Sequence, residues 1–285
     1  MGKLTKASLV LIPFGIVVSI VGGVIMAISE PPLGAIDEYT KTTYDVTEIV
    51  QTEVYGEMVD EGLNFAQNEA DSIVINCTAA NIELYHSENY SILSDYSFEK
   101  DFAVNHEDGV IYVNYNKEKI TDFEPDFDGG DISIGVPRSC KSIKIQCNVG
   151  DITVEEFMGR CIDISIDCGN VSINNCNVSE SCRIKNTLGN VSSFNSQISN
   201  LDAKLISGNL DIYETFLSGY NEAEVDVGNA EFTLDGYPSD YSIKANVKVG
   251  EIECDYNLDD YTNSENTIDI SVLAGNCSIE YYDYD

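Results

Sequence analysis

From residue 130 onward, one pattern of polar and apolar positions recurs along the chain. Each copy begins with glycine, continues with Asp, Asn or Glu, and then usually alternates between apolar and variable positions. The copies begin at Gly130, Gly150, Gly169, Gly189, Gly208, Gly228, Gly250 and Gly275. Successive glycines are 20, 19, 20, 19, 20, 22 and 25 residues apart, so the period is nearly constant and marks an internal repeat.

A second alternating segment precedes the glycine in most repeats. Before Gly150, for example, the apolar residues Ile143, Ile145 and Cys147 are separated by polar ones. A period of two predicts a strand with one buried face and one exposed face. Each repeat is therefore predicted to contain two short strands joined at a sharp corner, because glycine and a following Asn or Asp adopt positive φ at low cost.

A repeat of this length cannot bury its apolar face alone, whereas stacked repeats bury a continuous core between them. The sequence therefore predicts an all-β fold, a parallel β-solenoid (β-helix) of two-strand coils of about 20 residues, with one coil above another. An antiparallel sandwich also has closely spaced strands, but it does not explain why the same corner recurs at every second strand.

The N-terminal part of the chain has a different character. Leu9 to Ser29 is an uncharged, largely apolar run, long enough as a helix to cross a membrane. Lys3 and Lys6 precede this run, so the positive-inside rule predicts a cytoplasmic N-terminus and places residues 30–285 outside the membrane. The alternatives are a signal peptide cleaved near Ala27-Ile28-Ser29, which would make the protein secreted, and a buried core helix.

These patterns divide the chain into three parts. Residues 1–29 are the predicted membrane anchor, and residues 30–67 are a juxtamembrane spacer rich in Tyr, Thr and acids. Residues 68–285 are the β-solenoid ectodomain, with irregular coils over 68–129 and regular repeats over 130–285. Terminal coils are expected to be less regular because they must cap the core.

Charge narrows the range of partners. The chain has 15 Lys and Arg against 49 Asp and Glu, for a net charge of −34. Only Lys3 and Lys6 precede the first acid, Glu30, so residues 30–285 carry 13 minus 49, or −36. This charge disfavours nucleic acid and unaided docking on anionic lipid, since both require a basic surface. A hydrophobic content of 43% nevertheless supplies a core and argues against disorder.

Residues that commonly carry enzyme chemistry are scarce. The chain has no Trp, and His86 and His106 are its two histidines. Ser-hydrolase, zinc-protease and phosphate-loop motifs are absent from the sequence. Carboxylates are so numerous that no pair stands out for glycoside cleavage. We therefore predict no catalytic, cofactor-binding or metal-binding residues, no cofactor and no enzymatic activity.

One segment, Asp122 to Asp131, concentrates five carboxylates in ten residues. Clustered carboxylate oxygens suit Ca²⁺, but an EF-hand loop that starts at Glu124 would place Gly135 where the bidentate Glu is required. A solvated acidic turn between the irregular and regular coils is the favoured interpretation.

The nine cysteines contain no C-x-x-C pair, and their spacing fits no small disulfide scaffold. Cys147, Cys254 and Cys277 fall on inward positions of the repeat, where a free thiol packs as a small apolar group. Disulfides between neighbouring coils, such as Cys147–Cys168 or Cys161–Cys182, remain an alternative.

Glycosylation motifs of the Asn-x-Ser/Thr type overlap the repeat. They occur at Asn76, Asn89, Asn170, Asn177, Asn190 and Asn276. Asn170, Asn190 and Asn276 coincide with the corner that follows the glycine, so a structural role in turns and stacked amides is the favoured interpretation of these positions.

The beginning of the regular part resembles a known bacterial family. The runs Asp131 to Pro137 (DISIGVP), Ser142 to Ile145 (SIKI) and Gly150 to Val154 (GDITV) are similar to a large "putative adhesin" family of domains of unknown function. The resemblance covers roughly residues 65–285. It implies stacked β-strand repeats behind one N-terminal anchor, with some relatives in Lia-type cell-envelope stress systems. The family has no agreed catalytic residues that could be carried over to this chain.

Together, the pattern and the resemblance predict a membrane-anchored, non-enzymatic adhesion or binding module at the bacterial cell surface. One alternative is a component of cell-envelope stress sensing that binds cationic peptides or wall material. A weaker alternative is a β-helix enzyme acting on polysaccharides. The predicted partners are the membrane, through the N-terminal helix, and a cell-surface, cell-wall or cationic peptide ligand. The oligomeric state is left open.

Overall fold

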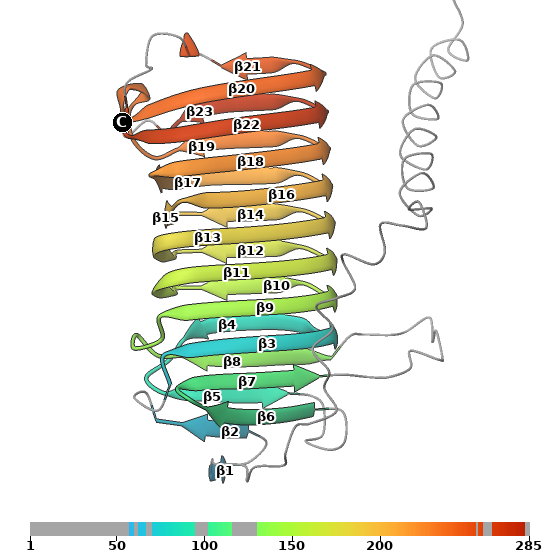
Figure 1. Cartoon of the computed structure of the whole chain (residues 1–285), viewed down its shortest axis with the longest axis vertical. Helices are drawn as coiled ribbons and strands as arrows, with labels where there is room; N and C mark the ends of the chain where they lie inside the picture. The colour runs from blue at the N-terminus through green and yellow to red at the C-terminus, as the bar shows by residue number, and fades with distance from the viewer. Residues whose placement is uncertain are drawn as a thin grey trace, which may run out of the picture. The chain divides into compact units, whose positions relative to one another are not determined.

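Alternation of buried and exposed residues, as in β3 (Ser72–Ala79), produces a structure built almost entirely of strands. The computed structural model describes residues 57–59, 62–66, 70–94, 102–115, 130–254, 256–258 and 264–282 (Figure 1). Its strands fall in one compact unit, Glu53–Asp285. The predicted anchor, most of the predicted spacer and most of the acidic segment lie outside the described residues. Within those ranges no helix is long and apolar enough to cross a membrane.

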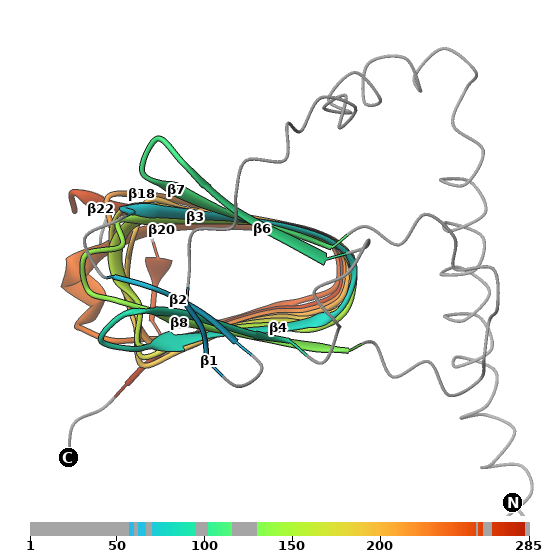
Figure 2. The same cartoon turned by 90° about the horizontal axis from the view of Figure 1, so that it is seen from below.

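Two mostly parallel sheets form the long sides of the strand stack (Figure 2). Sheet A contains the strands that follow each corner: β4 (Asn81–His86), β8 (Asp131–Val136), β10 (Ile152–Glu155), β12 (Val171–Asn174), β14 (Val191–Phe194), β17 (Leu210–Ser218), β19 (Ala230–Leu234), β21 (Ile252–Cys254) and β23 (Cys277–Tyr281). Sheet B contains the other long strands: β3, β7 (Val110–Tyr115), β9 (Ser142–Val149), β11 (Met158–Cys168), β13 (Asn177–Leu188), β16 (Leu201–Ser207), β18 (Tyr220–Val227), β20 (Tyr241–Val249) and β22 (Asn266–Ala274).

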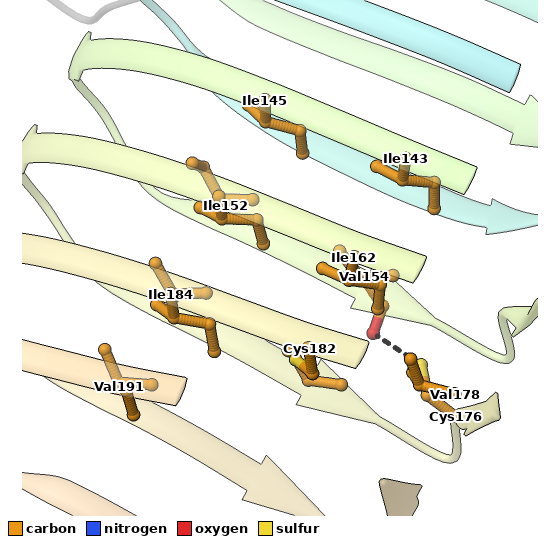
Figure 3. Packing of buried hydrophobic residues seen from close by; sticks show 14 of the residues in the cluster. Ile143, Ile145, Ile152, Val154, Ile162, Cys176, Val178, Cys182, Ile184 and Val191 are labelled. Atoms are coloured by element: carbon orange, nitrogen blue, oxygen red, sulfur yellow. Dashed lines mark hydrogen bonds between the residues drawn. The ribbon is translucent and has the colours of Figure 1, made fainter. Parts of the chain in front are cut away.

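The predicted all-β, mostly parallel fold is therefore confirmed, and the antiparallel sandwich is wrong. Successive coils pair in register, so equivalent residues lie directly above one another. Ile143 of β9 lies beside Ile162 of β11, and Ile152 of β10 lies beside Val171 of β12. All four are at most 1% exposed, and Figure 3 shows how such side chains fill the space between the sheets. Burial of each contributes roughly 1.5–3 kcal/mol relative to exposure, and this continuous column is what the isolated repeat lacks.

The corner requires glycine for two reasons. Gly208 has φ of +147°, a conformation that residues with a side chain rarely adopt. A Cβ atom at this position would also collide with the backbone carbonyl of Gly189 in the neighbouring coil. The same relationship links Gly169 to Gly150 and Gly189 to Gly169, so the repeat period reflects a column of touching backbones.

Several coils have a third, short side that the two-strand pattern does not predict. It is formed by the first residues of β11 and β13, by β15 (Gln197–Ser199) and by the end of β17. The chain enters this side through a residue with positive φ, for example Asn175 or Asn195. Phe157, Val178 and Ile198 bury the inner surface of this side, and Val178 and Ile198 each lie nine residues after a corner glycine.

Near the N-terminal end of the stack, the coils do not follow chain order. The coil β3–β4 lies between β7–β8 and β9–β10, although β7–β8 comes between them in the sequence. Figure 1 shows this as cyan β3 between two green strands. Residues 72–86 therefore form a regular coil inside the segment predicted as irregular, and we call them the N-terminal inserted coil.

Chain order is broken again at the other end. The coil β22–β23 lies between β18–β19 and β20–β21, so the last coil of the chain is the second coil from the end of the stack. In Figure 1, red β22 accordingly lies between two orange strands. The glycine intervals of 22 and 25 residues fall in this region and supply the additional length with which the chain passes over one coil.

Antiparallel strands complete the N-terminal end. In sheet A, β5 (Tyr90–Ser94) pairs antiparallel with β8, followed by β2 (Gly62–Phe65) and β1 (Glu57–Val59). In sheet B, β6 (Phe102–Glu107) pairs antiparallel with β7. Two of these strands, β1 and β2, fall within residues 30–67, the range predicted as spacer. A change of strand direction removes the repeating edge onto which further coils would stack.

Candidate functional site

The described surface is poor in concave sites. A shallow depression beside His86, Pro137 and Phe157 encloses only about 10 Å³, roughly the room for one water molecule and far less than a small-molecule pocket. Arg138 at its edge donates a hydrogen bond to the backbone carbonyl of Glu156 at 3.0 Å. Over the part of the chain that the structure describes, the open faces of the stack therefore offer more binding surface than this depression does.

The structure does not bring the two histidines together. His86 ends β4 in sheet A, whereas His106 lies in β6 of sheet B. Among the described residues, no group of three or more His, Cys, Asp or Glu side chains is placed to hold a metal ion. The sequence predicted no metal-binding residues, and the geometry of the described residues adds no metal-binding candidate.

The outward face of sheet B carries charges of both signs. Arg183 on β13 lies 3.4 Å from a carboxylate oxygen of Asp202 and 4.0 Å from one of Asp163. Lys204 on β16 lies 3.3 Å from Glu224, and this hydrogen bond raises the pKa of Lys204. These pairs come from neighbouring coils at the same distance from the corner, so sheet B neutralises part of its own negative charge.

Sheet A has a different surface. None of its described strands contains Lys or Arg. Its outward positions carry Ser and Thr together with carboxylates from six of its strands, interrupted at β12 and β14: Glu83, Glu155, Asp211, Glu231, Glu253 and Glu280. We call this surface the acidic face. Its negative charge has no Lys or Arg on the described strands to offset it.

Two carboxylates of the acidic face lie directly opposite each other. Asp211 of β17 pairs in register with Glu231 of β19. Partial burial and the neighbouring Glu231 charge raise the pKa of Asp211 above its ordinary value. Like charges opposite each other on adjacent strands reduce stability, so folding alone does not explain this arrangement.

A stacked pair of aromatic rings lies one outward position further from the corner, on β14 and β17. Phe194 of β14 and Tyr213 of β17 have ring centroids 5.8 Å apart and an angle of 11° between their planes. They are 42% and 46% exposed. Aromatic faces attract ammonium and guanidinium groups, and carboxylates bind them by charge. Phe194, Asp211, Tyr213 and Glu231 together form what we call the acidic–aromatic patch.

The cysteines behave mainly as core residues. Cys147 and Cys277 are buried, as predicted, and Cys254 is partly buried in the terminal coil. The disulfides considered from sequence are both wrong. Cys168 is exposed opposite Val149, away from the buried Cys147, and Cys161 lies opposite Ser181 rather than Cys182.

The corner asparagines form a ladder of hydrogen bonds. The side-chain oxygen of Asn170 accepts the backbone N–H of Asn190 at 3.0 Å, and that of Asn229 accepts the N–H of Asn276 at 3.0 Å. The amide of Asn76, another glycosylation motif, donates to Asn114 at 2.8 Å. These contacts support the structural interpretation of the corner positions.

The sequence analysis missed the acidic–aromatic patch although the signal was present. Parallel, in-register stacking keeps equal distances from the corner aligned. Asp211 and Glu231 each lie three residues after a corner glycine, and Phe194 and Tyr213 each lie five residues after one. Alignment of the repeats on glycine would therefore have placed the pairs together.

One family model matches the chain, and solved structures resemble it at low sequence identity. The family model described as Toastrack DUF4097 matches residues 81–279. No curated protein matches the chain. Among solved structures, a "putative cell adhesion protein" from Clostridium sporogenes ATCC 15579 is 15% identical, with a TM-score of 0.35; the match covers 78% of this chain and 98% of that one.

Two further structures have similar statistics. A "putative adhesin" from Bacteroides fragilis NCTC 9343 is 16% identical, with a TM-score of 0.44, and the match covers 78% of this chain and 96% of that one. A "putative lipid binding protein" from Parabacteroides distasonis ATCC 8503 is 15% identical, with a TM-score of 0.34 and the same two coverages, 78% and 96%.

Proposed function

Since the chain belongs to the Toastrack DUF4097 family, we propose that it is a non-enzymatic binding module at the bacterial cell surface. In this proposal the apolar run from Leu9 to Ser29 anchors the chain in the membrane, and residues 30–285 lie outside. The order of charges supports this orientation, because Lys3 and Lys6 precede the run and the first acid follows it.

The acidic face of sheet A is the proposed binding surface, and its ligand is a polycationic peptide or polymer. One observation carries this choice: the described strands of sheet A contain no Lys or Arg, whereas sheet B pairs its acids with Lys and Arg. A surface of one sign attracts ligands of the opposite sign over about 10 Å at 0.1 M salt.

The acidic–aromatic patch would provide the short-range contacts. Phe194 and Tyr213 offer a stacked, half-exposed aromatic surface for the alkyl part and the charge of a Lys or Arg side chain. Asp211 lies on β17, as Tyr213 does, and Glu231 lies on the neighbouring β19. The two carboxylates would bind the charged end of the ligand's Lys or Arg side chain. A cationic ligand would also relieve the repulsion between the two carboxylates.

Binding of a defined probe tests this proposal. The full chain, purified in a non-ionic detergent, is titrated with a ten-residue oligolysine and with an oligolysine containing two Trp, at low and high salt. We expect both to bind with an affinity that falls as salt rises, and the Trp-containing probe to bind more tightly. Absence of binding, or binding insensitive to salt, would contradict the proposal.

Matched variants separate the acidic face from net charge. Asp211→Asn combined with Glu231→Gln removes two charges from sheet A, and Asp163→Asn combined with Asp269→Asn removes two from sheet B. We expect the first pair to weaken oligolysine binding about tenfold, equivalent to about 1.4 kcal/mol, and the second pair by less than twofold. Equal weakening by both pairs would show that overall charge alone attracts the probe.

Location and physiological role need separate measurements. Protease treatment of intact cells is expected to digest residues 30–285. If these residues remained intact, the chain would face the cytoplasm, and the proposed location would be wrong. Induction by cell-wall antibiotics would favour the stress-sensing role, whereas surface attachment without induction would favour adhesion. Turnover of a glycan by the purified chain would contradict the non-enzymatic part of the proposal.

A further inference from the structure

One pair of cysteines lies in register on neighbouring strands. Cys77 of β3 is directly opposite Cys147 of β9. Both side chains point into the core, where they are 6% and 3% exposed. The two residues are 70 positions apart in sequence and become neighbours because the N-terminal inserted coil packs against β9–β10.

The other strand cysteines have no such partner. Cys161 lies between Ser142 and Ser181, and Cys168 lies between Val149 and Leu188. Cys182 lies between Ile162 and Leu201, and Cys277 lies between Ala230 and Ile252. Cys254 lies opposite Ile279. Among the described strands, cross-strand geometry therefore singles out one pair.

The spacing of parallel strands permits a bond between these residues. Neighbouring strands lie about 4.8 Å apart, and the Cα atoms of disulfide-bonded cysteines usually lie about 4.4–6.8 Å apart. The Cys147 thiol lies 3.4 Å from the backbone carbonyl oxygen of Val149, and its interaction with the neighbouring Cys77 thiol lowers the pKa of Cys147 and raises that of Cys77. The two side chains thus enter the core from directly opposite positions, on backbones at a suitable separation.

We propose that Cys77 and Cys147 form a disulfide that fastens the N-terminal inserted coil to the first regular coil. The bond would close a loop containing β4 to β8, and a cross-link that closes a long loop reduces the conformational freedom of the unfolded chain. The bond would hold β3 against β9, two strands that are neighbours because the N-terminal inserted coil lies between β7–β8 and β9–β10.

The chemistry is thiol–disulfide exchange with a disulfide oxidant, such as oxidised glutathione or a thiol oxidase. The Cys147 thiolate attacks one sulfur of the oxidant, forms a mixed disulfide and releases the other sulfur as a thiolate. Cys77 then loses its proton and attacks the Cys147 sulfur, releasing the second thiolate. The two cysteines lose two electrons and two protons, and the oxidant is reduced to two thiols. Burial of both sulfurs places this step during folding, before the coil closes.

Mass spectrometry and thermal unfolding test the proposal together. The full chain in detergent is refolded with oxidised glutathione, denatured, alkylated without reduction and digested. We expect seven of the nine cysteines to be alkylated and one cross-linked peptide pair to contain Cys77 and Cys147. Reduction by dithiothreitol should lower Tm by roughly 5–10 °C.

Replacement of a buried cysteine can itself destabilise the fold, so the Tm values of the variants are not compared directly. The quantity compared is the change in Tm on reduction, which Cys77→Ala and Cys147→Ala should each abolish. Cys182→Ala, at a buried cysteine without a partner, should retain the change. Alkylation of all nine cysteines, a cross-link between another pair, or an unchanged reduction effect in Cys77→Ala would overturn the proposal. None of these outcomes depends on whether the acidic face binds cations.

Discussion

The side-chain oxygen of Asn190 accepts the backbone N–H of Asn209, which lies at the same corner in the next coil, at 2.9 Å. Its own backbone N–H donates to Asn170 on the other side at 3.0 Å. Asp151 fills the same role with a carboxylate, accepting the N–H of Asn170 at 2.8 Å. The corner therefore needs an acceptor oxygen at this distance from the backbone, whether it belongs to an amide or to an acid.

Loss of that oxygen should weaken the stack. We expect Asn190→Ala to lower the free energy of unfolding by about 1 kcal/mol, because the N–H of Asn209 loses its acceptor at an exposed corner. Asn190→Asp retains the acceptor and should remain within about 0.5 kcal/mol of the parent chain. Urea denaturation measures both, and equal losses in the two variants would show that the oxygen is not the important feature.

The corner glycine should tolerate no side chain. We expect Gly208→Ala to cost at least about 3 kcal/mol, because positive φ adds strain and the new Cβ meets the carbonyl of Gly189. Gly109 also has positive φ, at +77°, but nothing lies within 4 Å of its Cβ position. Gly109→Ala should therefore cost only about 1 kcal/mol. Similar losses on denaturation would contradict the role assigned to the backbone contact.

Because the last coil of the chain lies inside the stack, its removal by truncation should also destabilise the coil that precedes it in sequence. Among the described strands, β20 and β21 pair only with β22 and β23. In a chain that ends at Ser264, residues 241–254 therefore have no strand to pair with. A chain ending at Asp235 leaves β18–β19 as a terminal coil that still packs on β16–β17.

Hydrogen exchange distinguishes the two truncations. We expect residues 241–254 to exchange rapidly in the chain ending at Ser264, while residues 142–234 remain protected in both. The longer chain should therefore gain no stability over the shorter one. Protection of residues 241–254 without β22–β23 would contradict the observed coil order.

The charge of Asp211 should lower the stability of the folded protein at pH 7 and should strengthen the binding of a cationic ligand. Its pKa is raised in the folded protein by partial burial and Glu231, so the folded state favours the protonated form. Its contribution is most favourable below the unfolded pKa of about 3.8 and is lost as pH rises through the folded value. We expect Asp211→Asn to be a few tenths of a kcal/mol more stable at pH 7, because it removes the repulsion from Glu231 at a partly solvated position.

The same variant should bind oligolysine less tightly than the parent chain, even though it is more stable. Thermal unfolding at pH 4 and pH 7, with titration of the probe at pH 7, measures both effects. A variant that is less stable at pH 7, or that binds equally well, would contradict the role assigned to this carboxylate.

Local patterns predicted the repeating part of the structure because each feature recurs at a fixed distance from a glycine. Ile143, Ile145 and Cys147 are buried as their alternation indicated, and the Asn that follows the glycine lies at the predicted corner. The third side was not predicted, because each repeat supplies too few apolar residues there to show a period-two strand pattern, although Val178 and Ile198 recur 20 residues apart. The acidic–aromatic patch was readable in principle, since in-register stacking preserves the distance of Phe194 and Tyr213 from their glycines.

The fold of residues 130–285 as stacked β coils follows from the sequence alone, since period-two burial and a recurrent glycine corner are local properties of the chain. Tertiary structure alone decided which coils are neighbours. Residues with equivalent patterns, such as Ile243 and Ile268, fit equally well into any coil of a uniform column. Chain order therefore does not fix stacking order, and the contact between Cys77 and Cys147 exists only because an N-terminal coil packs between two others that follow it in the chain.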